Sequence, residues 1–280
     1  MKKTIFIAFI ILFLAGCTSV VEESATEKTA EADSTGIISE YYARFDKLMM
    51  GQVWPITDYD SNTISKEMIS NVLNKIPNAS KEVTELEKIV EKSGESEEFV
   101  SVNKEYLGLV KDLLDKHKEL YNYELDWEEY YSFDENENKL DELFLAISNC
   151  GCDDMDCDLF YEQSVATQKK AVDKFNEMGE EYNLKAIGEV ANYLDEEFKV
   201  IEEEVPDLVA KAKKYSVRDC YRISDPYMEL LGKLEEIEEP PEDDVDAEAS
   251  KKWFVPISNL LDEIEVSSLD FERVRAEVGQ

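Results

Sequence analysis

Apolar residues recur every three or four positions through most of the chain beyond residue 36, which is the period of amphipathic helices. We find no convincing run of the strict alternation that a half-buried strand shows. Pro77-Asn78 and Ser93-Gly94 are typical of helix ends, and residues 51–62 are typical of a loop. The pattern therefore predicts helices over residues 37–50, 64–76, 81–92 and 96–123.

The middle of the chain has a longer and more regular pattern. Residues 127–147 predict one broken helix or two short ones, and two apolar series follow over 158–182 and 184–215. The phase breaks at Tyr182-Asn183, which favours a helical hairpin over the alternative of one continuous helix with a stutter. The second series keeps its phase through Pro206, which predicts a kinked helix there.

The last part of the chain alternates between apolar and acidic segments. Ser224-Asp225-Pro226 predicts the start of a helix with proline in its first turn. Residues 238–247 are acidic, contain Pro-Pro and predict a linker before a helix over 253–264. Ser267-Ser268-Leu269-Asp270 resembles a capping box and predicts a short, separate last helix.

The expected fold is all-α, a multi-helix bundle that contains a long helical hairpin. The cysteine-rich segment that begins at Cys150 is the best candidate for a boundary. It divides the chain into helical subdomains over 37–149 and 150–280, and one continuous domain over 37–280 is the alternative.

The first residues follow a different plan. Lys2 and Lys3 precede an apolar run that ends in small residues, as in a signal peptide, and the run is shorter than the ~20 residues of a spanning helix. Leu14-Ala15-Gly16-Cys17 resembles the lipobox of prokaryotic lipoproteins. The resemblance implies that residues 1–16 are a removable leader and that Cys17 carries a diacylglycerol, whose two chains suffice for stable anchoring. It places the protein at the cell membrane or cell surface, outside the cytoplasm, with residues 17–36 as lipidated cysteine and flexible linker.

The charge of the chain limits the kinds of partner. The formal net charge is −35, and loss of Lys2 and Lys3 with the leader makes it −37. Nucleic acids and anionic lipid surfaces attract basic proteins, so the composition excludes a general role in binding either. A basic partner or a cation-rich setting fits this charge better.

The aromatic content of the chain concerns its core. The sequence has 12 Phe and 14 Tyr, which are enough to allow a substantial hydrophobic core.

The remaining cysteines form an even set, which favours two disulfides in an exported protein. All three pairings are open, although a bridge from Cys150 to Cys152 would be strained. If residues 158–182 and 184–215 pair as a hairpin, Cys220 returns beside the other three cysteines. Basic residues near Cys220 would then face the acidic segment. The cysteines concerned are Cys150, Cys152, Cys157 and Cys220; the basic residues are Lys211, Lys213, Lys214, Arg218 and Arg222, and the acidic ones are Asp153, Asp154, Asp156 and Asp158. Free thiols, a metal site and a reactive Cys220 between two arginines are weaker alternatives.

Other candidate chemistry is weak. The four aspartates are weak metal ligands, and the Asp134-Asn136-Asn138 spacing fails as an EF-hand because Lys139 and Leu145 replace the required Gly and Glu. Asn78 opens a glycosylation sequon, which Ser80 as a helix cap explains equally well. We expect His117 to be a satisfied residue at the edge of the core, and the aromatic residues over 121–131 to pack rather than stack on a ligand.

The chain has one histidine and no distinctive catalytic motif, so we expect a protein that is not an enzyme and needs no cofactor. The expected function is that of a membrane-anchored lipoprotein whose helical domain binds or scaffolds an unidentified envelope protein or a basic partner. A solute- or cation-binding lipoprotein is the first alternative. A hydrolase that uses carboxylates is the second.

Overall fold

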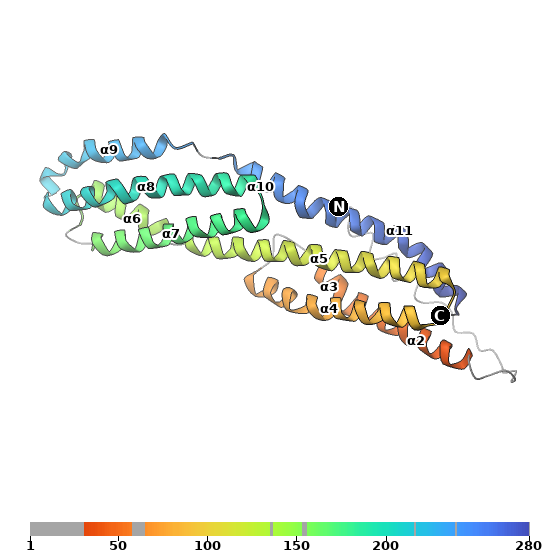
Figure 1. Ribbon diagram of the computed structural model, residues 1–280. Helices are drawn as coiled ribbons and strands as arrows, with labels where there is room; N and C mark the ends of the chain where they lie inside the picture. The colour runs from red at the N-terminus through yellow and green to blue at the C-terminus, as the bar shows by residue number, and fades with distance from the viewer. Residues whose placement is uncertain are drawn as a thin grey trace, which may run out of the picture.

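The computed structural model describes residues 31–57, 65–134, 137–152, 156–215, 217–238 and 240–279, and the regular elements within these ranges are helices. The predicted all-α, multi-helix bundle is therefore confirmed. The helices lie roughly along one direction and form an elongated molecule (Figure 1). Residues 1–30, including the predicted leader, Cys17 and most of the linker, lie outside the described residues.

Long helices make up most of the described residues, and short π-helical and 3₁₀ turns connect some of them. The α-helices are α2 (Glu31–Leu48), α3 (Trp54–Thr57), α4 (Lys66–Lys92), α5 (Glu97–Asp134), α6 (Glu137–Ser148), α7 (Cys157–Tyr182), α8 (Lys185–Lys214), α9 (Tyr221–Glu235), α10 (Glu242–Ala249) and α11 (Val255–Glu277), and the short turns are η1 (Met49–Val53), η2 (Val217–Asp219) and η3 (Ser250–Phe254).

Two prolines do not lie where the sequence predicted relative to the ends of their helices. Pro77 does not end a helix: α4 continues through it to Lys92. A proline inside a helix costs about 3 kcal/mol, but Ile76, Ala79 and Val83 around it are fully buried, and that packing outweighs the cost. Pro226 also lies inside a helix rather than in its first turn, because α9 already begins at Tyr221.

Several predicted breaks are absent because packing continues through them. α5 extends to Asp134 instead of ending near residue 123, and α2 begins at Glu31, within the predicted linker. Of the loop predicted over 51–62, the described residues 51–57 belong to η1 and α3, and α10 begins within the acidic linker. Local composition predicted these segments wrongly because it does not show which neighbours cover them.

The serine pair at 267–268 also does not start a new helix. α11 runs unbroken from Val255 to Glu277, and Ser268 Oγ donates to the Glu265 carbonyl at 2.6 Å instead of capping. Ile264 and Phe271 are buried on both sides of the serines. The apolar face that packs against α5 therefore carries the helix through this polar interruption.

The predicted hairpin is confirmed. α7 ends at Tyr182, and Asn183 takes a left-handed conformation with φ of 49°, which lets the chain reverse into α8. Glu248 of α10 accepts a hydrogen bond from the Ala186 N–H at 3.1 Å, so the acidic segment caps the start of α8.

The buried apolar residues form two clusters. We call the larger one the aromatic core. It includes residues of α2, α4, α5 and α11 together with the turn end of the α7–α8 hairpin. The smaller one, the aliphatic core, includes α6, α9, the open end of the hairpin and three of the cysteines. The aromatic core takes residues from both sides of residue 150, and the division of the chain into subdomains stays a prediction.

Candidate functional site: the cysteine-linked tip

The four cysteines that the structure describes lie at one end of the molecule and form two disulfides. Cys150 is bonded to Cys220, and Cys152 to Cys157, with Cα atoms 5.6 and 5.5 Å apart, which are ordinary separations for disulfides. The first bond joins the end of α6 to the start of α9, and the second closes a short ring before α7. The predicted return of Cys220 beside the other cysteines is thereby confirmed. We call residues 148–152, 156–161, 208–215 and 217–228 the tip.

Local hydrogen bonds shape the chain around the disulfides. Cys150 is left-handed, with φ of 52°, and the Cys150 and Gly151 N–H groups donate to the Ile147 and Ala146 carbonyls. This is a Schellman motif, which ends α6 and turns Cys150 toward α9. Asp156 begins α7 by accepting a hydrogen bond from the Leu159 N–H at 3.1 Å.

The acidic residues that were weak metal candidates have structural contacts where the structure describes them. Asp156 caps α7, and Asp158 forms an ion pair with Lys213. Asp153 and Asp154 lie outside the described residues, as do the side chains of Asp134, Asn136 and Asn138. Within the described residues, no group of three or more histidine, cysteine or acidic side chains is arranged to hold a metal ion.

Basic residues gather at the tip, but only some of them face acids. Besides the pair of Lys213 with Asp158, Lys211 pairs with Asp207 of its own helix at 2.5 Å. Lys214 and Arg218 are exposed, and no ion pair links either to a carboxylate of the described residues. The prediction that this basic cluster faces the acidic segment is therefore shown for one pair only.

Arg222 lies among aromatic rings. Its guanidinium carbon is 5.7 Å from the centre of the Tyr215 ring and 5.8 Å from that of Tyr221, within the range of cation–π contacts. Tyr221 is 69% exposed and Met228, two helical turns further along α9, is 60% exposed. The tip thus presents cations and large apolar side chains to solvent together.

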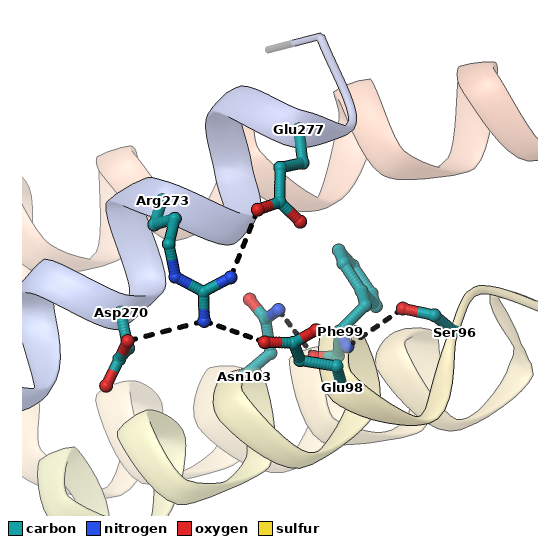
Figure 2. Close-up of polar contacts among 7 residues, drawn as sticks. All are labelled: Ser96, Glu98, Phe99, Asn103, Asp270, Arg273 and Glu277. Atoms are coloured by element: carbon teal, nitrogen blue, oxygen red, sulfur yellow. Dashed lines mark hydrogen bonds and ion pairs between the residues drawn. The ribbon is translucent and has the colours of Figure 1, made fainter.

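The opposite end of the molecule is held by polar contacts between α5 and α11 (Figure 2). Arg273 donates to Glu98 of α5 at 2.8 Å and also to Glu277 and Asp270 of its own helix. These three carboxylates raise the pKa of Arg273. Ser96 begins α5 by accepting a hydrogen bond from the Phe99 N–H at 3.2 Å. The contacts explain how two helix ends are joined there without a disulfide.

A cluster of polar side chains also lies at the middle of the molecule. Asp126 of α5 accepts hydrogen bonds from Lys174 and Tyr182, both at 2.5 Å, and Lys174 also pairs with Glu129 at 3.0 Å. Burial, followed by the bond to Asp126, raises the pKa of Tyr182. Burial opposes the charge of Lys174, but its two acidic partners outweigh burial and raise the pKa of Lys174. The arrangement joins α5 to α7 and uses the carboxylates for structure.

The remaining candidate residues have structural environments. His117 is buried, and its Nδ1 donates to the Leu113 carbonyl at 2.9 Å; burial lowers the pKa of His117. Tyr123 packs on Trp253 with ring centres 4.4 Å apart, and Tyr130 packs on Phe175 at the same distance. Packing by these aromatic residues is as predicted, while His117 lies deeper than predicted.

The glycosylation candidate lies on a helix. Asn78 is exposed within α4, and Ser80 is inside the same helix, where its carbonyl accepts from Thr84 Oγ1 at 3.0 Å. Ser80 therefore does not cap a helix, because α4 begins well before it. Sequence reasoning found the cysteines of the tip but missed Tyr221 and Met228 as exposed residues. Only the packing of α9 shows their exposure.

Comparison with protein-family models, curated proteins and solved structures found no match for this chain. Among the described helices, none has a stretch long and apolar enough to cross a membrane.

Proposed function

We propose that this protein is a lipid-anchored, extracytoplasmic lipoprotein, and that its helical domain displays the tip to another component of the envelope without acting as an enzyme. One observation carries the proposal. The described chain begins, at α2, at the end of the molecule opposite the disulfides (Figure 1). An anchor joined to that end would place the tip farthest from the membrane.

Dimensions support this role. α5 alone contains 38 residues, which corresponds to about 57 Å at 1.5 Å per residue. The segment between Cys17 and Glu31 would reach about 20 Å as a flexible coil of its length. A tether shorter than the rigid part keeps the α2 end near the bilayer and leaves the tip outside.

The polar interior also supports a binding or scaffolding role. Asp126 is a partly buried carboxylate beside a lysine and a tyrosine, which is a setting that could suit an acid or a base. It already accepts hydrogen bonds from Lys174 and Tyr182. An acid so engaged holds two helices together, which is a structural use.

The anchor is tested by mass spectrometry of the protein purified from host membranes. We expect an N-terminal peptide that starts at Cys17 and carries diacylglycerol, and we expect Cys17→Ser to retain the leader and lose the lipid. An intact leader on the unaltered protein would overturn the proposal.

The orientation is tested with the anchored protein in vesicles that contain a lipid-bound fluorescence quencher. A fluorescent amino acid replacing Glu95, two residues before α5, should be quenched, whereas one replacing Met228 should not. Equal quenching at both positions would show a molecule lying on the membrane and would contradict display of the tip.

A further inference from the structure

α11 has one side that is covered and one that is not. Ile264, Phe271 and Val274 are buried in the aromatic core. The opposite side of the helix is exposed, and α11 lies along α5 at an edge of the molecule (Figure 1). The exposed residues on that side follow one another at intervals of four and three. They are Val255, Asn259, Asp262, Val266, Leu269 and Arg273, and we call them the outer seam.

The outer seam has the spacing of a coiled coil. Alternating intervals of four and three define the a and d positions, which bring side chains to one face of a helix for packing against a second helix. Val266 and Leu269 are adjacent members of the seam and are 70% and 74% exposed. Single exposed apolar residues are ordinary on protein surfaces, whereas these two are neighbours on one face. The seam therefore has a site where apolar side chains of another helix can pack.

The positions beside the outer seam are acidic. With Val266 as an a position and Leu269 as a d position, the e and g positions are all exposed carboxylates. They are Glu263, Glu265, Asp270 and Glu272. Between Lys252 and Arg273 the chain has five acids and no basic residue. Because e and g residues select a partner by charge, this pattern selects a helix with basic e and g positions.

Little of this acidic charge is compensated within the molecule. Asp270 lies 3.3 Å from Arg273, and Glu272 lies 3.6 Å from Arg275, so cations face the acids at one end of the seam. The other acids on this side form no ion pair with a described residue. They are Asp262, Glu263 and Glu265. The unpaired charge is thus next to Val266.

The neighbouring helix adds further acids. Arg273 pairs with Glu98, so the side of α5 that carries Glu98 faces α11. Glu105 and Asp112 follow at intervals of seven on that side and are exposed.

The nearby lysines of α5 do not offset these acids. Lys104 pairs with Glu91 of α4, so it lies on the side toward α4, and Lys111 follows it there by seven residues. Lys116 is paired with Glu119 of its own helix at 2.8 Å. The surface around the outer seam therefore carries a net negative charge.

We propose that the outer seam binds a basic amphipathic helix of a partner protein, as one helix of a coiled coil binds another. Apolar side chains of the partner cover Val266 and Leu269, and its lysines or arginines pair with Glu263 and Glu265. This contact is lateral. It adds to the proposed display of the tip and does not depend on the lipid anchor.

Charge and shape disfavour other occupants. A second copy of this chain would place acids against acids at the e and g positions, which is repulsive. A small polycation would pair with the carboxylates and leave Val266 and Leu269 exposed. Asn259 and Asp262 on the seam need polar partners, and polar residues at a and d positions favour a single register.

Peptide binding to the full, lipidated protein in vesicles of zwitterionic lipid tests the proposal. The probe is a peptide of about three heptads with leucine at a and d and lysine at e and g. One matched probe has glutamate at e and g, and another has the composition of the lysine peptide in scrambled order. Fluorescence anisotropy should show the lysine peptide binding at least about tenfold more tightly than either matched probe. Vesicles without protein correct for binding to lipid.

Substitutions on the seam separate packing from charge. Val266→Ser with Leu269→Ser should weaken binding of the lysine peptide about tenfold, because its leucines lose their apolar contacts. Met68→Ser is the control, since Met68 is 49% exposed on α4 and should not affect binding. Equal circular dichroism spectra and melting temperatures would show that these variants fold.

A charge reversal gives the sharper readout. Glu263→Lys with Glu265→Lys should weaken the lysine peptide at least about tenfold and allow the glutamate peptide to bind. Glu177→Lys with Glu180→Lys makes the same change at exposed positions of α7 and should do neither.

Photo-crosslinking in host cells examines the natural occupant. Benzoylphenylalanine replaces Leu269, and the control variant carries it at Met68. We expect the Leu269 variant alone to form an adduct, which mass spectrometry should locate in a basic segment of another protein with apolar residues at heptad spacing.

Several outcomes would overturn the inference. In the binding experiment, these are equal binding of the scrambled peptide and no effect of either seam variant. In cells, they are an adduct with a second copy or another part of this chain, an adduct with a segment that is not basic, and no adduct at all. An unlipidated Cys17 would instead refute the proposed function and leave the binding of a basic helix standing.

Discussion

The aromatic core and the aliphatic core use different means to hold helices together. In the aromatic core, Phe271 packs on Phe45 and Tyr106 with ring centres 4.5 and 4.7 Å apart, and the helix ends are joined by ion pairs such as Arg273 with Glu98. Among the described residues, the buried members of the aliphatic core include no aromatic side chain. One disulfide joins the end of α6 to the start of α9, and a second closes the short ring before α7. A small core buries less apolar area, so covalent links replace packing where packing is insufficient.

The largest expected effect comes from the aromatic core. Phe271→Ala should lower the free energy of unfolding by about 3 to 5 kcal/mol, because a fully buried ring with several aromatic neighbours leaves a cavity. Urea unfolding followed by circular dichroism measures this. Leu269→Ala on the same helix, where Leu269 is 74% exposed, should change it by less than about 0.5 kcal/mol. Equal losses would mean that α11 does not pack as described.

The two disulfides should differ in their effect on the aliphatic core. Replacing Cys150 and Cys220 with serine removes a link across 70 residues and should cost about 4 kcal/mol by the chain-entropy relation. Replacing Cys152 and Cys157 removes a link across 5 residues and should cost about 2 kcal/mol.

Hydrogen exchange by mass spectrometry places these losses in the molecule. Protection should fall in α6 and α9 and stay largely unchanged in α2 and α4, because those helices belong to different cores. A reductant should lower the free energy of unfolding of the unaltered protein. It should have no effect on a variant in which serine replaces each of the four disulfide-bonded cysteines. Uniform loss of protection would show that the two cores unfold as one.

A change at Asp126, where the two cores meet, should cause a moderate loss of stability. Tyr182→Phe removes one of the hydrogen bonds to Asp126 and should lower the free energy of unfolding by about 1 to 2 kcal/mol. Tyr161→Phe is the matched control, because its hydroxyl makes only a long, exposed bond of 3.4 Å to Glu202. If both variants unfold at the same urea concentration as the unaltered protein, Asp126 is not a structural junction.

The smallest effect concerns pH. Burial lowers the pKa of His117 in the folded state, so the unfolded state binds a proton first as the pH falls below about 6.5. Stability from the neutral residue is therefore complete above that pH and decreases as the pH falls toward the folded pKa. Thermal melts from pH 7.5 to 5.5 should show the unaltered protein losing up to about 1 kcal/mol relative to His117→Gln. A constant difference would place His117 in a solvated environment.

The sequence predicted the helices best where their apolar faces are long and regular. The α7–α8 hairpin and the return of Cys220 followed from two series of apolar residues whose phase breaks at Asn183. α8 continues through Pro206 as predicted, but the predictions failed at Pro77 and at Ser267, because local signals for a break cost a few kcal/mol at most. Burial of the residues on either side exceeds that cost, and burial depends on neighbours distant in sequence.

For the tip, the chain by itself determined the cysteines, the basic cluster and an even number of thiols for two bridges. Only the tertiary structure decided which cysteines pair, which cations face acids, and that Tyr221 and Met228 remain exposed beside them. The physical reason is that the period of a helix fixes which residues share a face. Whether that face is covered depends on how helices far apart in the chain pack together.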